Sequence, residues 1–165
     1  MQRSWIRQNR MTGEWVIFAP SRGKRPSDFA AGSSAVREDR PPYDDECPFC
    51  PGNEKKLPGI ILEKKIASEK SWSTRVILNK FPALTPEGTM ERHHDGPYLY
   101  TEGYGKHEIV IETPSHNRDI PDLAEEEMKL LIETYTERYG DLMESHANAL
   151  VMIFRNHGLN AGTSL

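Results

Sequence analysis

Cys47 and Cys50 stand in the sequence Cys-Pro-Phe-Cys, a spacing that puts two thiols on one tight turn. Such a pair typically binds a metal ion or carries out redox chemistry. A redox pair normally follows an apolar strand at the start of a helix, where the helix dipole lowers the thiol pKa. Residues 41–46 are instead Pro-Pro-Tyr-Asp-Asp-Glu, which predict no strand and oppose a thiolate. We favour half of a tetrahedral zinc site, with two unconnected reduced thiols as the alternative.

The remaining zinc ligands would come from the six histidines of the chain. His116 lies in a polar turn directly after a predicted strand at residues 107–112. A histidine at a strand end is easily directed at a fixed metal ion, so His116 is the candidate third ligand. The alternative is an ordinary loop histidine exposed to solvent.

Two polar segments could bind phosphate. Arg22, Lys24 and Arg25 lie within four residues, and arginine can pair with phosphate oxygens through two hydrogen bonds. The alternative is a solvated basic loop. Near the other end of the sequence, Asn156, Gly162 and Ser164 could present backbone and side-chain donors to an oxyanion, or could form an ordinary turn.

The elements that must position these residues are short strands and one long helix. Apolar or alternating runs predict strands at 15–18, 75–78, 107–112 and 149–154, the last buried on both faces. Gly- and Pro-rich stretches at 21–58 and 85–105 predict irregular connections. This order implies an α+β domain with a mostly antiparallel sheet and one long helix.

The helix is predicted from about residue 123 to 146. Asp122 with Glu125 fits a capping box, and three glutamates at 125–127 suit the helix N-terminus. An apolar stripe at helical spacing predicts packing against a sheet. The stripe consists of Met128, Leu131, Ile132, Tyr135, Tyr139, Leu142 and Met143.

Composition limits the function class. The 165 residues are 36% hydrophobic and 28% charged, which fits one globular domain and excludes a disordered chain. We expect a cytoplasmic protein, since no apolar run is long enough for a membrane span and no secretory signal begins the sequence. Residues 1–26 carry six basic side chains against Glu14, so the rest of the chain holds the excess acid. This asymmetry favours an anionic small molecule over nucleic acid.

Five motifs together resemble the N-terminal half of galactose-1-phosphate uridylyltransferases, a family of the histidine-triad superfamily. They appear in the family's order and span almost the whole chain. The motifs lie at residues 13–26, 47–54, 75–84, 105–116 and 154–165.

The resemblance implies that residues 1–165 form a histidine-triad-like domain, about half of a longer protein. The family's structural zinc would be held by Cys47, Cys50, His116 and a further histidine. That histidine belongs to a His-Pro-His-x-Gln motif expected just after Leu165. The second histidine of the same motif is the family's nucleophile, so we expect no catalytic nucleophile in this chain and no activity from it alone.

The resemblance also implies substrates and binding roles. The nucleophile attacks the α-phosphate of a nucleotide sugar, and the bound nucleotide then passes to a second hexose 1-phosphate. Arg22 and Arg25 would contact phosphates, and Asn79 would border the nucleoside. Asn156, Gly162 and Ser164 would hold the α- and β-phosphates. The family's enzymes are homodimers, so we expect a homodimer for the full-length protein.

Three functions stay open. We favour a UDP-glucose–hexose-1-phosphate uridylyltransferase of galactose metabolism. Uridylyltransferases of this family carry Asn-Asp-Phe where this chain has Asn79-Lys80-Phe81, so an adenylyl-specific relative acting on ADP-glucose is the alternative. A non-catalytic, zinc-stabilised nucleotide-binding module is the third. We expect neither nucleic acid nor a membrane as a partner.

Overall fold

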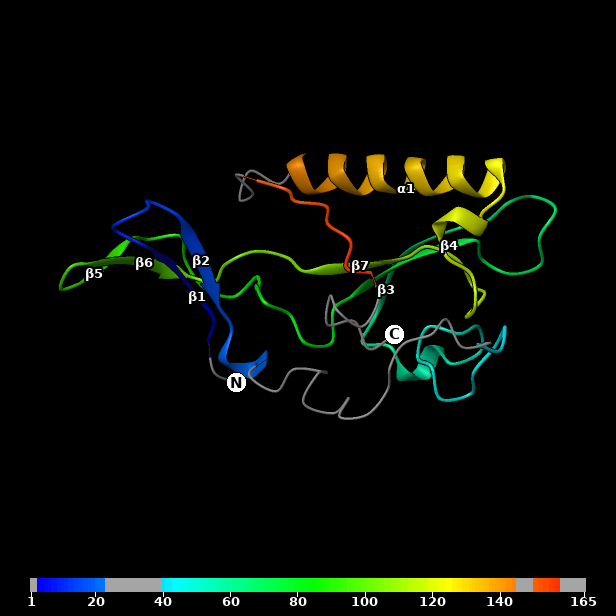
Figure 1. The fold of residues 1–165 in the computed structure, drawn as a ribbon, viewed down its shortest axis with the longest axis horizontal. Coiled ribbons are helices and arrows are strands. Elements are labelled where there is room, and N and C mark those ends of the chain that lie inside the picture. The colour runs from blue at the N-terminus through cyan, green and yellow to red at the C-terminus, as the bar shows by residue number, and fades with distance from the viewer. Residues whose placement is uncertain (1–2, 23–39, 145–149, 158–165) are drawn as a thin grey trace. The chain divides into compact units, whose positions relative to one another are not determined.

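The computed structural model describes residues 3–22, 40–144 and 150–157 (Figure 1). The chain divides into two compact units. The first comprises Met1–Ala31 and Phe81–His107, and the second comprises Gly32–Lys80 and Glu108–Leu165. Within the described residues, no helix is both long and apolar enough to cross a membrane.

The first unit is built on a four-stranded antiparallel sheet. Its strands are β1 (Trp5–Gln8), β2 (Trp15–Phe18), β5 (His93–Asp95) and β6 (Tyr98–Glu102), in the order β2-β1-β6-β5. Gly13, in the turn between β1 and β2, has a φ of 75°, a conformation that glycine adopts without steric cost. A short 3-10 helix, η1 (Pro20–Arg22), follows β2 and carries Arg22 at its end.

The second unit holds a three-stranded antiparallel sheet. Its strands are β3 (Ile60–Lys64), β4 (Thr74–Leu78) and β7 (Glu108–Ile111), in the order β3-β4-β7. The first four residues of the central strand β4 are all buried. Side chains alternate along a strand, so Thr74 and Val76 face one side of the sheet while Arg75 and Ile77 face the other.

Each side of this sheet is covered by a different element. The helix α1 (Glu125–Glu144) lies along the Thr74 side, where the Thr74 and Thr134 hydroxyl oxygens are 2.8 Å apart (Figure 1). On the opposite side, Trp72, Ile77 and Ile111 form a core cluster. Phe49, Leu57 and Ile109 pack against that cluster. The second unit therefore has three layers: a helix, a sheet, and the segment that carries both cysteines.

The predicted fold class is confirmed, because the protein is α+β with antiparallel sheets and, in its described part, one long helix. The strands expected at 15–18, 75–78 and 107–112 are β2, β4 and β7. The alternation predicted around Ile109 and Ile111 is confirmed as well, since both side chains belong to or pack against the core cluster.

The sequence analysis missed four strands. β5 and β6 lie inside the stretch 85–105 that was expected to be irregular, and β1 and β3 were not predicted. β5 has the sequence His-His-Asp, which carries no apolar alternation. Its conformation comes from pairing with β6, because cross-strand contacts can override weak local preference.

The buried strand predicted at 149–154 is wrong over residues 150–154, which the structure describes as irregular. Leu150, Met152 and Phe154 are 74%, 70% and 63% exposed. A strand needs a hydrogen-bonded neighbour, and an apolar run specifies burial without specifying that neighbour. Ala149 lies outside the described residues.

The helix is also shorter at its start than predicted. Asp122 belongs to a separate 3-10 helix, η4 (Ile120–Asp122), whose capping box pairs it with Asp119. Glu127 instead accepts a hydrogen bond from the Ala124 backbone N–H at 2.7 Å, just ahead of α1. Leu131 is fully buried as predicted, but three members of the apolar stripe are exposed because the sheet beneath α1 is narrow. These are Ile132, Tyr139 and Met143.

Candidate metal centre and substrate-binding residues

The structure brings together the three predicted metal ligands. The Sγ atoms of Cys47 and Cys50 and a ring nitrogen of His116 all lie within 4.8 Å of one another. Cys50 Sγ lies 3.6 Å from His116 Nδ1, across 66 residues of sequence. Both cysteines are buried, and neither forms a disulfide. The thiols and the imidazole therefore converge on one small volume.

A series of turns holds the two thiols in place. Backbone hydrogen bonds run from Cys47 N–H to Asp44 O, from Cys50 N–H to Cys47 O, and from Asn53 N–H to Cys50 O. The Asn53 side chain donates to the carbonyl oxygens of Asp44 and Cys47 at 3.1 and 2.7 Å. The turn is thus closed by its own hydrogen bonds.

His116 reaches the cysteines because its loop is fixed at two points. Its backbone N–H donates to Pro42 O at 2.9 Å, which joins the loop to the chain just before the cysteines. Two residues later, Arg118 makes two hydrogen bonds to the Glu127 carboxylate on α1, at 2.7 and 2.6 Å. These bonds hold the pKa of Glu127 below its usual value. The loop after β7 is therefore clamped to the helix.

The cysteine environment favours the thiol form in the absence of a cation. Burial raises the pKa of the Cys50 thiol, and the neighbouring Cys47 raises it further. The Asp44 backbone N–H, 3.4 Å from Cys50 Sγ, acts in the opposite direction. Metal binding would release protons from these thiols, so the affinity of the site for a metal ion should rise with pH.

The donor set fits zinc. In a tetrahedral site with Zn–S about 2.3 Å and Zn–N about 2.0–2.1 Å, sulfur and nitrogen are about 3.6 Å apart. The Cys50–His116 distance of 3.6 Å meets this requirement. Among the described residues, no further histidine, cysteine or carboxylate joins the three. The cluster could therefore hold a metal ion through three protein ligands.

Three of the predicted substrate-binding residues lie in the described part of the chain. Arg22, in the first unit, is exposed at the end of η1. Burial lowers the pKa of His107, and the positive charge of Arg22 lowers it further. Asn79, in the second unit, directly follows β4 and is half-buried. Asn156, also in the second unit, is exposed. Arg25, Gly162 and Ser164 lie outside the described residues.

The position of Asn156 depends on a network that the sequence analysis missed. The adjacent Arg155 donates from Nε to both oxygens of Glu112 and from Nη2 to Asp119. The Tyr135 hydroxyl donates to the same Glu112, and burial raises the pKa of Tyr135 to about 12. Segment 150–157 is therefore anchored by ion pairs instead of by strand pairing.

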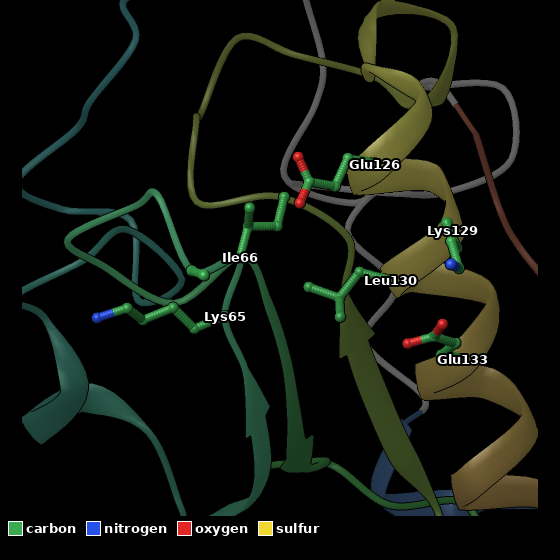
Figure 2. A pocket seen from close by; sticks show the side chains of 7 residues that line it. Lys65, Ile66, Glu126, Lys129, Leu130 and Glu133 are labelled. Carbon is green, nitrogen blue, oxygen red and sulfur yellow. The ribbon is translucent and has the colours of Figure 1, made fainter.

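A small pocket of about 190 Å³ lies beside the first half of α1 in the second unit. Figure 2 shows the Leu130 side chain pointing from α1 toward Ile66, with Glu126 and Glu133 nearby. Lys65 and Lys129 also line it, so the two glutamates are balanced in charge. None of the predicted site residues lines this pocket.

Residues 1–165 match the sequence family described as galactose-1-phosphate uridyl transferase, N-terminal domain. This chain belongs to that family. A curated relative, the ADP-glucose phosphorylase of Arabidopsis thaliana, is 30% identical over 162 residues, covering 97% of this chain and 45% of the relative. The galactose-1-phosphate uridylyltransferase of Thermotoga maritima is 27% identical, with 97% and 43% covered.

Solved structures of family members have the same fold. The crystal structure of the Arabidopsis thaliana ADP-glucose phosphorylase, determined with bound ADP-glucose, matches with a TM-score of 0.61 at 27% identity. That match covers 99% of this chain and 46% of the other. A uridylyltransferase structure matches with a TM-score of 0.67 at 23% identity, covering 98% and 42%. The chain thus spans a little under half the length of these relatives.

Proposed function

We propose that this chain is the N-terminal half of a zinc-containing nucleotidyltransferase acting on a nucleotide sugar and a hexose 1-phosphate. The observation that carries the proposal is the convergence of Cys47, Cys50 and His116 into a donor set that fits zinc. It occurs in a chain that matches the family over all 165 residues. Zinc would serve as a structural ion here, since it would join the cysteine turn to the loop after β7.

The proposed reaction proceeds through a nucleotidyl-histidine, with a nucleophile located beyond Leu165. The imidazole forms a bond to the α-phosphorus, and the bond from that phosphorus to the bridging oxygen breaks to release a sugar 1-phosphate. A phosphate oxygen of the second hexose 1-phosphate then displaces the histidine. Arg22 and Arg25 would bind phosphate oxygens. Donors on Asn156, Gly162 and Ser164 would stabilise charge that develops on the phosphoryl group.

Uridine is the first candidate nucleoside, because several curated relatives are named galactose-1-phosphate uridylyltransferase. Adenine is the second candidate. Two observations favour it: the 30% identical relative is named ADP-glucose phosphorylase, and Lys80 follows Asn79 where the family's uridylyltransferases carry aspartate. A lysine beside the nucleoside pocket would change the hydrogen-bonding groups available to the base.

Isothermal titration of the protein extended through its C-terminal half separates the two candidates. We expect UDP-glucose to bind at least about tenfold more tightly than ADP-glucose, a difference of about 1.4 kcal/mol. Tighter ADP-glucose binding would assign the protein to the adenylyl candidate. If neither nucleotide sugar binds, the proposed function is wrong. Binding by the 165-residue chain without any transfer by the longer protein would favour the non-catalytic module.

A further inference from the structure

Arg75 is a charged side chain in the middle of an otherwise uncharged central strand. Its side chain is only 3% exposed. Its guanidinium carbon lies 4.3 Å from the centre of the Trp72 ring, and Trp72 belongs to the core cluster. Burying a charge is costly unless it is paired and hydrogen-bonded. The groups that pair with Arg75 therefore indicate what role this buried charge has in the structure.

Arg75 pairs with two carboxylates on two different segments. Nε donates to Glu63 on β3 at 2.6 Å, and Nη2 donates to Glu54 at 2.8 Å. The two carboxylates are similarly accessible, since their side chains are 41% and 38% exposed. The pair with Glu63 joins neighbouring strands that already share a ladder. The pair with Glu54 crosses from the sheet to the segment after the cysteines.

Glu54 links Arg75 to the turn that holds the two cysteines. The Glu54 oxygen that accepts from Arg75 also accepts the Gly52 backbone N–H at 3.1 Å, and Gly52 is two residues from Cys50. The hydrogen bond from Arg75 lowers the pKa of Glu54, so the carboxylate is ionised at neutral pH. The cysteine turn is closed by its own hydrogen bonds. Both apolar packing and the Arg75–Glu54 ion pair to β4 join it to the sheet.

The same strand leads to the third ligand. Arg75 is opposite Ile111 in the β4–β7 ladder, and His116 follows Ile111 by five residues. β4 therefore contacts both parts of the site: it binds the cysteine turn through Glu54, and it pairs with β7, which leads to the His116 loop. Removing a group that hydrogen-bonds to a metal ligand typically changes metal affinity by about 10- to 100-fold, and the Glu54 contact lies two residues from Cys50 on the same turn.

We propose that Arg75, acting through Glu54, is a positioning residue that holds the Cys47–Cys50 turn in register with His116 for metal binding. The proposal rests on the metal site assigned under the proposed function. Apolar packing of Phe49 and Leu57 brings the turn onto the sheet, but such packing is not directional. The Arg75–Glu54 hydrogen bond adds a directional restraint on the turn.

Glu54 and Glu63 provide a matched pair of variants. Each carboxylate loses one hydrogen bond to the same arginine when it is truncated, but only Glu54 contacts the cysteine turn. Glu54→Ala should weaken Zn²⁺ binding by about 10-fold or more, measured by competition with a chromophoric chelator. Glu63→Ala should change it by less than about threefold. Glu54→Gln keeps an oxygen acceptor for both donors, so it should restore part of the affinity.

Two further readouts separate positioning from general stability. The Co²⁺-substituted protein reports ligand geometry through its visible absorption bands, which should shift in Glu54→Ala and remain unchanged in Glu63→Ala. Urea denaturation of both metal-free variants shows whether they lose comparable stability. Equal loss of Zn²⁺ affinity in the two alanine variants would overturn the positioning role while leaving the metal site intact. Absence of Zn²⁺ and Co²⁺ binding by the wild-type protein would overturn the metal site itself, and the positioning role with it.

Discussion

At the scale of single residues, His107 is the group whose protonation the structure constrains most clearly. Its Nδ1 accepts a hydrogen bond from the Ala83 backbone N–H at 2.9 Å, so the neutral ring carries its proton on Nε2. Burial lowers the pKa of His107 below 6.5, and the positive charge of Arg22 lowers it further. Protonation of Nδ1 would bring its N–H against the Ala83 N–H and would add a positive charge that the charge of Arg22 disfavours.

The lowered pKa predicts a pH-dependent loss of stability. Because the unfolded chain takes up a proton on His107 near pH 6.5 and the folded chain does so only at lower pH, the unfolded state binds more protons in between. The contribution of neutral His107 is therefore complete above pH 6.5 and is lost as the pH falls through the folded-state pKa. Urea denaturation between pH 5 and pH 7.5 measures this loss, within the approximate range where histidine titrates.

His107→Asn is the matched variant for that measurement. Asparagine can place its side-chain oxygen where Nδ1 accepts the Ala83 N–H, but it does not titrate. The free energy of unfolding should therefore depend less on pH in this range than it does for the wild-type protein. The same slope in both proteins would show that other groups cause the pH dependence.

Residue types and spacing were sufficient to predict that Cys47, Cys50 and His116 form a cluster that could hold a metal ion, but not the ion pair that links the cysteine turn to β4. Cys47 and Cys50 are adjacent on one turn, and His116 was predicted because it follows a strand. Arg75 and Glu54 are 21 residues apart, and their pairing exists only because the segment after the cysteines folds back on β4. An arginine within the buried run 74–77 was a signal of a buried ion pair, although its partners cannot be read from one sequence.

At the scale of elements, a buried hydroxyl pair is among the contacts that join α1 to the sheet. Thr134 Oγ1 donates to the Leu130 carbonyl at 2.8 Å, so it acts as the acceptor for the Thr74 hydroxyl, also at 2.8 Å. Thr134 and Thr74 are 0% and 1% exposed. The Thr74 hydroxyl therefore depends on Thr134 for its hydrogen bond within the described residues.

Because Thr134 has a second hydrogen-bond partner and Thr74, in the described part of the chain, does not, the two single variants and the double variant should differ in stability in a non-additive way. Thr134→Val removes the acceptor and leaves the buried Thr74 hydroxyl unpaired, which should cost about 1–3 kcal/mol of stability. Thr74→Val should cost less, because Thr134 keeps its bond to Leu130. The double variant should be more stable than Thr134→Val alone, as measured by urea denaturation. Additive losses in the double variant would contradict the assigned donor and acceptor.

The elements show where sequence patterns specify structure and where they do not. The strand at 15–18, the two that became β4 and β7, and the long helix all have strong local patterns, and all were predicted. β5 was missed because His-His-Asp has no such pattern and exists as a strand through its pairing with β6. Segment 150–154 has a strong apolar pattern, but the structure anchors it through Arg155 and leaves it outside the sheets. A pattern predicts a strand reliably only when a partner strand is available.

At the scale of the whole molecule, many large apolar side chains of the described residues are exposed to solvent. In the first unit, all four residues of β2 are exposed, from Trp15 at 40% to Val16 at 49%. β2 is the end strand of its sheet, and no described strand pairs with its outer edge. An exposed, apolar end strand favours pairing with another chain. The relatives, about twice as long, provide additional chain that could cover such a surface.

The 165-residue chain on its own should therefore self-associate through β2 at micromolar concentrations. Ile17→Lys places a charge on this strand, and the loss of about 1.5 kcal/mol or more of apolar burial should weaken association by about tenfold. Ile132→Lys is the matched control, because Ile132 is 53% exposed against 46% for Ile17 but lies on α1, which has no free strand edge. Sedimentation velocity over a concentration series measures both variants. If they weaken association equally, exposed apolar area in general drives it; if only Ile17→Lys does so, β2 is the surface through which the 165-residue chain associates.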